Sequence, residues 1–167
     1  ENYTFTRIGN LRRLNLGNCI ISNISGQSLE LLSSLEHLNL GNNFLEKIDN
    51  KTFTGLGKLT ELYLFGNRLN SLKPHTFKDL HKLQILTLNR NQLINLEIGM
   101  FSGLTALREL HLDRNKIERL TSGVFQKLPN VEVLSLSHNR LQHVETNSFG
   151  GLFNLKELNL ENNRLEY

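Results

Sequence analysis

Residues 59–82 read LTELYLFGNRLNSLKPHTFKDLHK, and residues 83–106 read LQILTLNRNQLINLEIGMFSGLTA. Both stretches carry leucine at positions 1, 4, 6, 11, 14 and 22, asparagine at position 9 and phenylalanine at position 19. The same pattern, with aliphatic substitutions, returns every 24 residues from Leu11 onward. A pattern held in fixed phase at this period predicts a stack of equivalent structural units.

The repeats divide the chain without leaving room for a linker. Six full units occupy residues 11–154, residues 1–10 fit the end of a preceding unit, and residues 155–167 begin a seventh. We therefore interpret residues 1–167 as a single repeat array. Because such stacks need polar caps at their ends, we also expect the chain to be an internal fragment of a longer array.

Composition narrows the function classes. The net charge is +3 and 21% of the residues are charged, which excludes a disordered polyelectrolyte and gives no reason to expect a nucleic-acid partner. No apolar run approaches the roughly 18 residues of a membrane span, so we expect no membrane insertion by this segment. The chain has one cysteine, Cys19, and therefore no internal disulfide.

The spacing of the first leucines predicts a strand in each unit. Alternate residues of a strand point to opposite faces, so Leu14 and Leu16 face inward whereas Asn15 and Gly17 face outward. Strands of successive units then stack in parallel, while the later aliphatic residues and the phenylalanine cover the back. We expect the outward positions to be exposed and the leucine, asparagine and phenylalanine columns to be buried.

The asparagine column has a structural explanation. After each strand the backbone turns inside an apolar interior, where unpaired N–H and C=O groups destabilise the fold. An asparagine amide offers both donors and an acceptor and can bridge adjacent units. Cys19 occupies this position in the first unit, and we expect it to be buried and structural. The predicted ladder consists of Asn43, Asn67, Asn91, Asn115, Asn139 and Asn163.

This repeat resembles the leucine-rich repeat family, in the 24-residue "typical" class of Toll-like receptors, Slit-like guidance proteins and small leucine-rich proteoglycans. The resemblance implies an α/β solenoid, a right-handed superhelix shaped like a horseshoe. About seven parallel strands would line its concave side, with loops or short helical turns on the convex side. It also implies an extracellular, non-catalytic module that binds a protein ligand, within a receptor ectodomain or secreted protein of innate immunity, development or adhesion.

Two other classes stay open. One is a structural protein of the extracellular matrix, similar to the proteoglycans, and the other is an intracellular scaffold or regulator, which would be cytoplasmic. Extracellular members of the family generally close their arrays with disulfide-bearing caps, which one cysteine cannot provide. We therefore expect the chain, if expressed alone, to fray at both ends or to be poorly soluble.

A candidate binding site lies on the predicted concave face. Tyr63 and Phe65 are two residues apart and project from the same face, and Ile85 lies diagonally on the next strand. The positions equivalent to Phe65 in the preceding units are Gly41 and Gly17, which predicts a shallow trough beside an apolar wall. Exposed aromatic patches are enriched at protein interfaces. The predicted partner-binding residues are Tyr63, Phe65, Ile85, Arg90, His111, Asp113 and Arg114.

Catalytic and cofactor chemistry is not expected. The chain has no glycine-rich phosphate loop and no paired CxxC, and its six histidines fall at different repeat positions, so we predict neither a cofactor nor a metal site. Ser135, His111 and Asp113 share outward positions on neighbouring strands. However, an open sheet supplies neither an oxyanion hole nor a pocket that excludes water, so we do not interpret them as an enzyme site.

Two further surface features are noted. A basic column runs through Arg68, Lys116, Arg140 and Arg164, directly after the asparagine column, and a sulfated glycan is a lesser candidate for this edge. Nearby acidic residues favour the interpretation that it is an ordinary solvated edge. Three sites match the N-glycosylation pattern and lie in arcs outside the strands, namely Asn2, Asn23 and Asn50.

Overall fold

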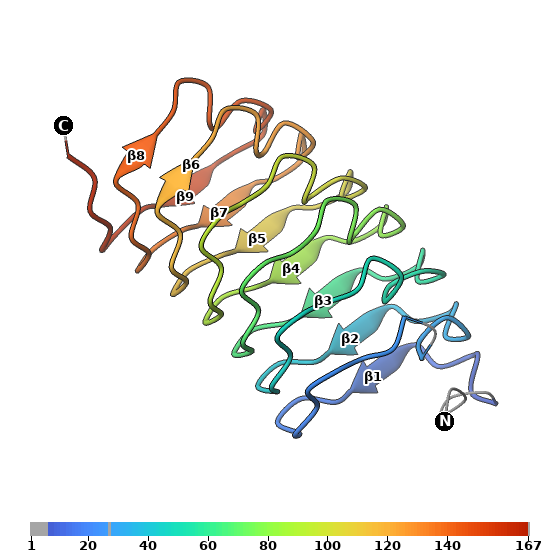
Figure 1. Cartoon of the computed structure of the whole chain (residues 1–167). Helices are drawn as coiled ribbons and strands as arrows, with labels where there is room; N and C mark the ends of the chain where they lie inside the picture. Colours follow the sequence, from blue (N-terminus) through green and yellow to red (C-terminus); the bar gives the residue numbers. More distant parts are fainter. Residues whose placement is uncertain (1–6, 27, 167) are drawn as a thin grey trace.

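The computed structural model describes residues 7–26 and 28–166, which form a solenoid built on one main sheet. Seven parallel strands follow the order β1-β2-β3-β4-β5-β7-β9, and the two ends of the chain lie at opposite ends of the stack (Figure 1). A second parallel sheet pairs β6 with β8. The strands are β1 (Arg13–Asn15), β2 (His37–Asn39), β3 (Glu61–Tyr63), β4 (Ile85–Thr87), β5 (Glu109–His111), β6 (Arg119–Leu120), β7 (Val133–Ser135), β8 (His143–Val144) and β9 (Glu157–Asn159).

The register of the main sheet follows the 24-residue period. Leu62 of β3 pairs with Leu86 of β4, which in turn pairs with Leu110 of β5. These central leucines are fully buried, whereas the residues on either side of them are partly exposed. The stacked parallel sheet predicted from the alternation is therefore confirmed.

The core is a continuous column of leucine and phenylalanine side chains. The rings of Phe101 and Phe125 stack with their centroids 5.9 Å apart, and those of Phe53 and Phe77 stack at 5.8 Å. Asn91 and Phe101 are 7% and 1% exposed, as the fold prediction requires. Each repeat packs on its neighbours, so the core runs through the array rather than being divided among the units.

Asn91 illustrates how the asparagine column joins the repeats. Its Nδ2 donates to the carbonyl oxygen of Leu88 in its own repeat at 3.0 Å and to that of Leu64 in the preceding repeat at 2.9 Å. Its Oδ1 accepts from the backbone N–H of Leu69, also in the preceding repeat, at 3.0 Å. Equivalent bonds recur at Asn43, Asn67, Asn115, Asn139 and Asn163.

The back of the solenoid differs from the α/β expectation. The described residues contain no helix, and the arcs are formed by hydrogen-bonded turns such as that from Leu56 N–H to Phe53 O at 3.2 Å. Residues with positive φ interrupt these arcs, as at Gly99 (φ 85°) and Gly103 (φ 97°), and a helix cannot continue through them. At Gly103 a Cβ would lie only 2.5 Å from Lys78 O, so the close approach of adjacent arcs also requires glycine.

The expectation for Cys19 was wrong, because its side chain is exposed. In the other repeats the column is buried because each asparagine lies against the carbonyl groups of the preceding repeat. The described residues include no complete repeat before Cys19 that could cover it. Its Sγ instead lies 3.7 Å from Gly17 O in its own turn.

Candidate functional site

Positions 3, 5 and 7 of each repeat point away from the core and form what we call the open face, which corresponds to the expected concave surface. Along the middle strands these side chains are half-buried rather than exposed as expected. The reason is that equivalent residues of adjacent strands lie only about 5 Å apart, so their side chains cover one another. The open face is therefore a packed layer of interacting side chains.

Tyr63 belongs to a polar cluster at the centre of the open face. Its hydroxyl donates to Glu61 Oε2 at 2.7 Å, and His37 Nδ1 lies 2.9 Å from the same oxygen. Three side chains from β2 and β3 thus meet at one carboxylate oxygen. This arrangement fixes the Tyr63 ring across the face.

The cluster shifts the pKa values of two of its members. Burial raises the pKa of Tyr63 to about 12, and the hydrogen bond to Glu61 and the charges of Glu61 and Glu109 act in the same direction. Burial alone would raise the pKa of Glu61 as well. Hydrogen bonds from Tyr63 and His37, with the charges of His37 and Arg13, outweigh burial and hold the pKa of Glu61 below its ordinary value.

The expected trough beside Phe65 is not open. A Cβ added at Gly41 would lie 2.5 Å from the Cε1 and Cζ atoms of Phe65, which means that the ring lies directly over this glycine. Gly41 is buried and Phe65 is half-buried as a result. The missing side chain at position 41 makes room for the aromatic ring instead of leaving an empty groove.

A hollow of about 470 Å³ instead lies on the other side of the two aromatic residues. It brings together four of the predicted site residues, Tyr63, Phe65, Arg90 and His111, but not Ile85, Asp113 or Arg114. A second hollow, of about 380 Å³, lies on the N-terminal side of Tyr63 and includes Glu61 and His37. Tyr63 thus forms a wall shared by both hollows. The complete lining of the larger hollow is Asn42, Tyr63, Phe65, Thr87, Asn89, Arg90 and His111.

Thr87 and Asn89 were missed by sequence reasoning. They occupy the outward positions that pair with Tyr63 and follow Phe65 in the next repeat, so the register alone could have identified them. Ile85 was chosen for its hydrophobicity, but it pairs with Glu61 and Glu109, away from the hollow. The Thr87 Oγ1 atom is buried and has no hydrogen-bond partner within residues 7–26 and 28–166.

His111 does not form part of a catalytic arrangement. It pairs with Ser135 in the strand register, but its Nε2 lies 3.4 Å from Glu109 Oε2. In the described part of the chain no hydrogen bond joins His111 to Ser135 or Asp113. The three residues therefore share a face without the mutual contacts that a nucleophile, base and orienting acid require.

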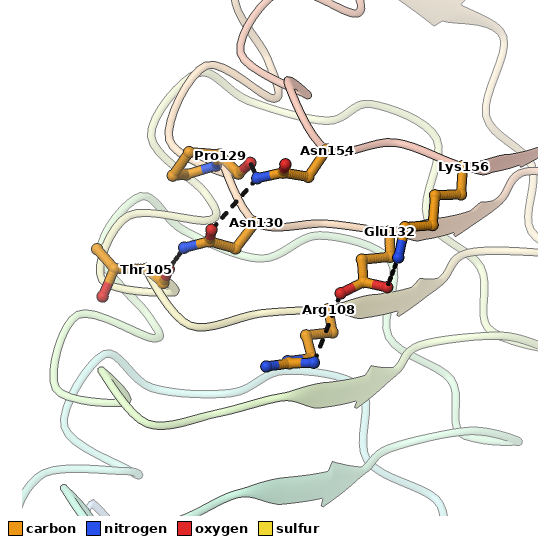
Figure 2. A network of polar contacts seen from close by, with 7 residues as sticks. All are labelled: Thr105, Arg108, Pro129, Asn130, Glu132, Asn154 and Lys156. Carbon is orange, nitrogen blue, oxygen red and sulfur yellow. Dashed lines mark hydrogen bonds and ion pairs between the residues drawn. The ribbon is translucent and has the colours of Figure 1, made fainter.

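The edge of the sheet where the strands begin is a network of paired charges and amides, shown in Figure 2. Glu132 accepts from Lys156 Nζ at 2.6 Å and lies 3.5 Å from Arg108 NH1. Asn130 Nδ2 donates to Thr105 O at 2.7 Å, so the amide joins adjacent arcs. The hydrogen bond and positive charge of Lys156 hold the pKa of Glu132 below its ordinary value. The cations on this edge are thus already partnered within the chain.

The remaining sequence predictions concern other surfaces. Asn23 and Asn50 are exposed in arcs outside the main sheet, and Asn2 lies outside the described residues. Across the described ranges, no group of three or more His, Cys, Asp or Glu side chains is arranged to hold a metal ion. Within the same part of the chain, no helix has the length and hydropathy needed to cross a membrane.

Comparison with known proteins now identifies the family. The leucine-rich repeat sequence profile matches residues 9–69, 58–117 and 105–165, which together span nearly the whole chain. The chain therefore belongs to the leucine-rich repeat family, whose domains typically recognise proteins and are generally non-catalytic. No curated protein matches the sequence significantly.

Solved structures with the same fold include three informative cases. The chain is 36% identical to TLR13 in its complex with ssRNA13, with a TM-score of 0.69, covering 93% of this chain and 25% of that one. A leucine-rich repeat protein of Leptospira interrogans is 34% identical, with a TM-score of 0.79 and coverage of 93% and 38%. Toll in the Drosophila Toll–Spätzle complex is 28% identical, with a TM-score of 0.82 and coverage of 96% and 22%. The chain thus spans between about a fifth and two fifths of these proteins.

Proposed function

We propose that this chain is the recognition module of an extracellular receptor or secreted protein and binds a protein partner on its open face. The observation that carries the proposal is the pair of aromatic residues Tyr63 and Phe65 beside the 470 Å³ hollow, in the middle of a rigid sheet. Aromatic side chains that are partly buried and held in place are frequent anchors of protein interfaces. They bind with little further loss of conformational entropy.

The surroundings of the aromatic pair fit a protein partner better than a small molecule. The hollow is shallow and open, and its lining offers amide, hydroxyl, imidazole and guanidinium groups around an apolar centre. Such an apolar centre with a polar rim is the common anatomy of protein interfaces. In the solved structures, Toll is described in a complex with Spätzle and in roles in development and innate immunity. For the present chain, participation in such processes is part of the proposal.

Site-specific photocrosslinking in the full-length protein tests the binding face. A photoreactive residue at Asn89, in the hollow, should capture a defined protein partner from the cells or medium in which the protein acts. The same residue at Lys127, exposed on the back of the solenoid, is the matched control. Capture at Lys127 but not at Asn89 would refute the assignment of the open face. Capture at Asn89 should disappear when Tyr63→Ala and Phe65→Ala are combined.

The compartment is tested separately by mass spectrometry of the full-length protein from its native cells. Glycan mass on Asn23 or Asn50 supports an extracellular location, because N-glycosylation takes place in the secretory pathway. Unmodified protein recovered from the cytosol would instead support an intracellular scaffold.

A further inference from the structure

The turn that follows each strand carries two rows of side chains, at positions 8 and 10 of the repeat. Within each row, residues of adjacent repeats touch. Asn42 Nδ2 donates to Asn18 Oδ1 at 2.9 Å in one row, and Lys116 Nζ donates to Gln92 Oε1 at 3.2 Å in the other. The two rows therefore run side by side along the stack, at the edge opposite to that in Figure 2.

Positive charge gathers on this edge in four successive repeats. We call the cluster of Arg68, Arg90, Arg114, Lys116 and Arg140 the basic edge. Two acidic residues, Asp113 and Glu118, lie in the same turns. Within residues 7–26 and 28–166, none of the five cations forms an ion pair. On the opposite edge, in contrast, Arg108 and Lys156 both contact Glu132 (Figure 2).

The backbone at position 8 gives a second, independent observation. This position has positive φ in every described repeat, and four of the seven repeats place asparagine or glycine there, as this conformation favours. Arg90 and Arg114 instead adopt φ values of 56° and 55°. A residue that pays a conformational cost where the chain elsewhere uses asparagine points to a role for its side chain beyond forming the turn.

We propose that the basic edge binds a sulfated polysaccharide. The backbone of the turn is fixed by hydrogen bonds between repeats, such as Arg90 N–H to Asp113 O and Arg114 N–H to Ser137 O, both at 2.9 Å. Cations therefore recur at about the 5 Å spacing of the strands. A linear polyanion that lies along the stack meets positive charge at each of the four repeats. Guanidinium groups suit this role, because they present several donors to an oxyanion.

The chemistry of the edge favours a sulfated glycan over single-stranded RNA. Binding of single-stranded nucleic acid usually combines cations with aromatic side chains on which bases stack. Between Arg90 and Arg140, positions 8 and 10 carry no aromatic residue. Phe44, further along the edge, is covered by the guanidinium of Arg68, which lies 4.4 Å from its ring centroid. The edge thus offers charge without a stacking surface.

Heparin binding by the full-length protein tests the proposal. The double variant Arg114→Asn with Arg140→Gln should bind heparin roughly tenfold or more weakly than the wild type, and its affinity should depend less steeply on salt. Neither residue lines the hollow beside Phe65. The matched control is Lys78→Gln with Lys127→Gln, which removes equal charge from exposed positions on the back and should leave affinity nearly unchanged. Equal losses in both variants would overturn the proposal, because they would indicate an effect of net charge alone.

Two further arms separate other outcomes. Tighter binding of a single-stranded RNA oligonucleotide than of heparin at the same salt concentration would overturn the assignment to a glycan. If Arg114→Asn with Arg140→Gln fails to fold, Lys116→Gln serves as a second variant, because the neighbouring repeat already has Gln92 at this position. Loss of heparin affinity in that variant supports the proposal, and unchanged affinity refutes it. Tyr63→Ala with Phe65→Ala should bind heparin normally, so failure of the open-face proposal is distinguishable from failure of this one.

Discussion

At the scale of single residues, the asparagine amide connects sequence and fold most directly. It is the one side chain in the repeat that donates to carbonyls and accepts from an N–H in the same turn. Leucine at the neighbouring positions supplies burial but cannot satisfy these groups. The column is therefore a structural requirement and not a binding feature.

Asn91→Ala should reduce the free energy of unfolding by about 1–3 kcal/mol, because it leaves buried backbone groups of two repeats without partners. Chemical denaturation of the purified protein measures the change. Asn95→Ala, at an exposed position of the same repeat, is the control and should have little effect. A loss at Asn91 no larger than that at Asn95 would show that the amide is dispensable.

Tyr63 should ionise near pH 12, about two units above its ordinary value of 10.0. Because the folded-state pKa is raised, the stabilisation that Tyr63 gains is fully present below pH 10 and is lost as pH rises toward 12. The difference in ultraviolet absorbance between wild type and Tyr63→Phe isolates this group during a pH titration. Glu61→Gln should move the transition to lower pH, and a transition near 10 in the wild type would contradict the Tyr63–Glu61 hydrogen bond.

At the scale of elements, the packing of Phe65 on Gly41 couples the turn after β3 to the turn after β2. In the wild type, Gly41→Ala should destabilise the protein by about 1–3 kcal/mol, because the new methyl group must displace the ring. In a Phe65→Ala background the same change should cost less, with a coupling free energy of about 1 kcal/mol.

A double-mutant cycle measured by chemical denaturation tests this coupling. Gly17→Ala, whose Cβ would meet asparagine side chains at 3.1–3.2 Å rather than Phe65, is the control and should be additive with Phe65→Ala. Additive effects at Gly41 as well would mean that the ring does not rest there. The cycle also addresses the expectation that removing Phe65 leaves folding unaffected, since the contact with Gly41 gives this residue a structural contribution.

The sequence predicted the strands and the core well, because both depend on burial with a strict period. Leu62, Leu86 and Leu110 pair at the register that the 24-residue spacing requires. The arcs were harder to predict, since positive φ values at Gly99 and Gly103 exclude helices without any change in hydrophobic pattern. The trough failed for a related reason: a missing side chain at Gly41 was interpreted as empty space, but a neighbouring ring fills it.

At the scale of the whole molecule, the stack fixes the distances between side chains that lie far apart in sequence. Tyr63, Arg90 and His111 come from three successive repeats and meet around one hollow because each repeat adds one strand. The two edges of the same sheet carry different chemistry, with paired charges where the strands begin and unpaired cations where they end. One rigid scaffold can thus present separate surfaces to separate partners.

The most direct test of the open-face proposal is the affinity of the full-length protein for the partner captured at Asn89. Tyr63→Ala and Phe65→Ala should each weaken binding by about 1–3 kcal/mol, measured by calorimetry on variants whose melting curves show that they are folded. Lys78→Gln on the back of the solenoid should bind as tightly as the wild type. Affinity unchanged by both aromatic substitutions would contradict the assignment of the open face as the recognition surface.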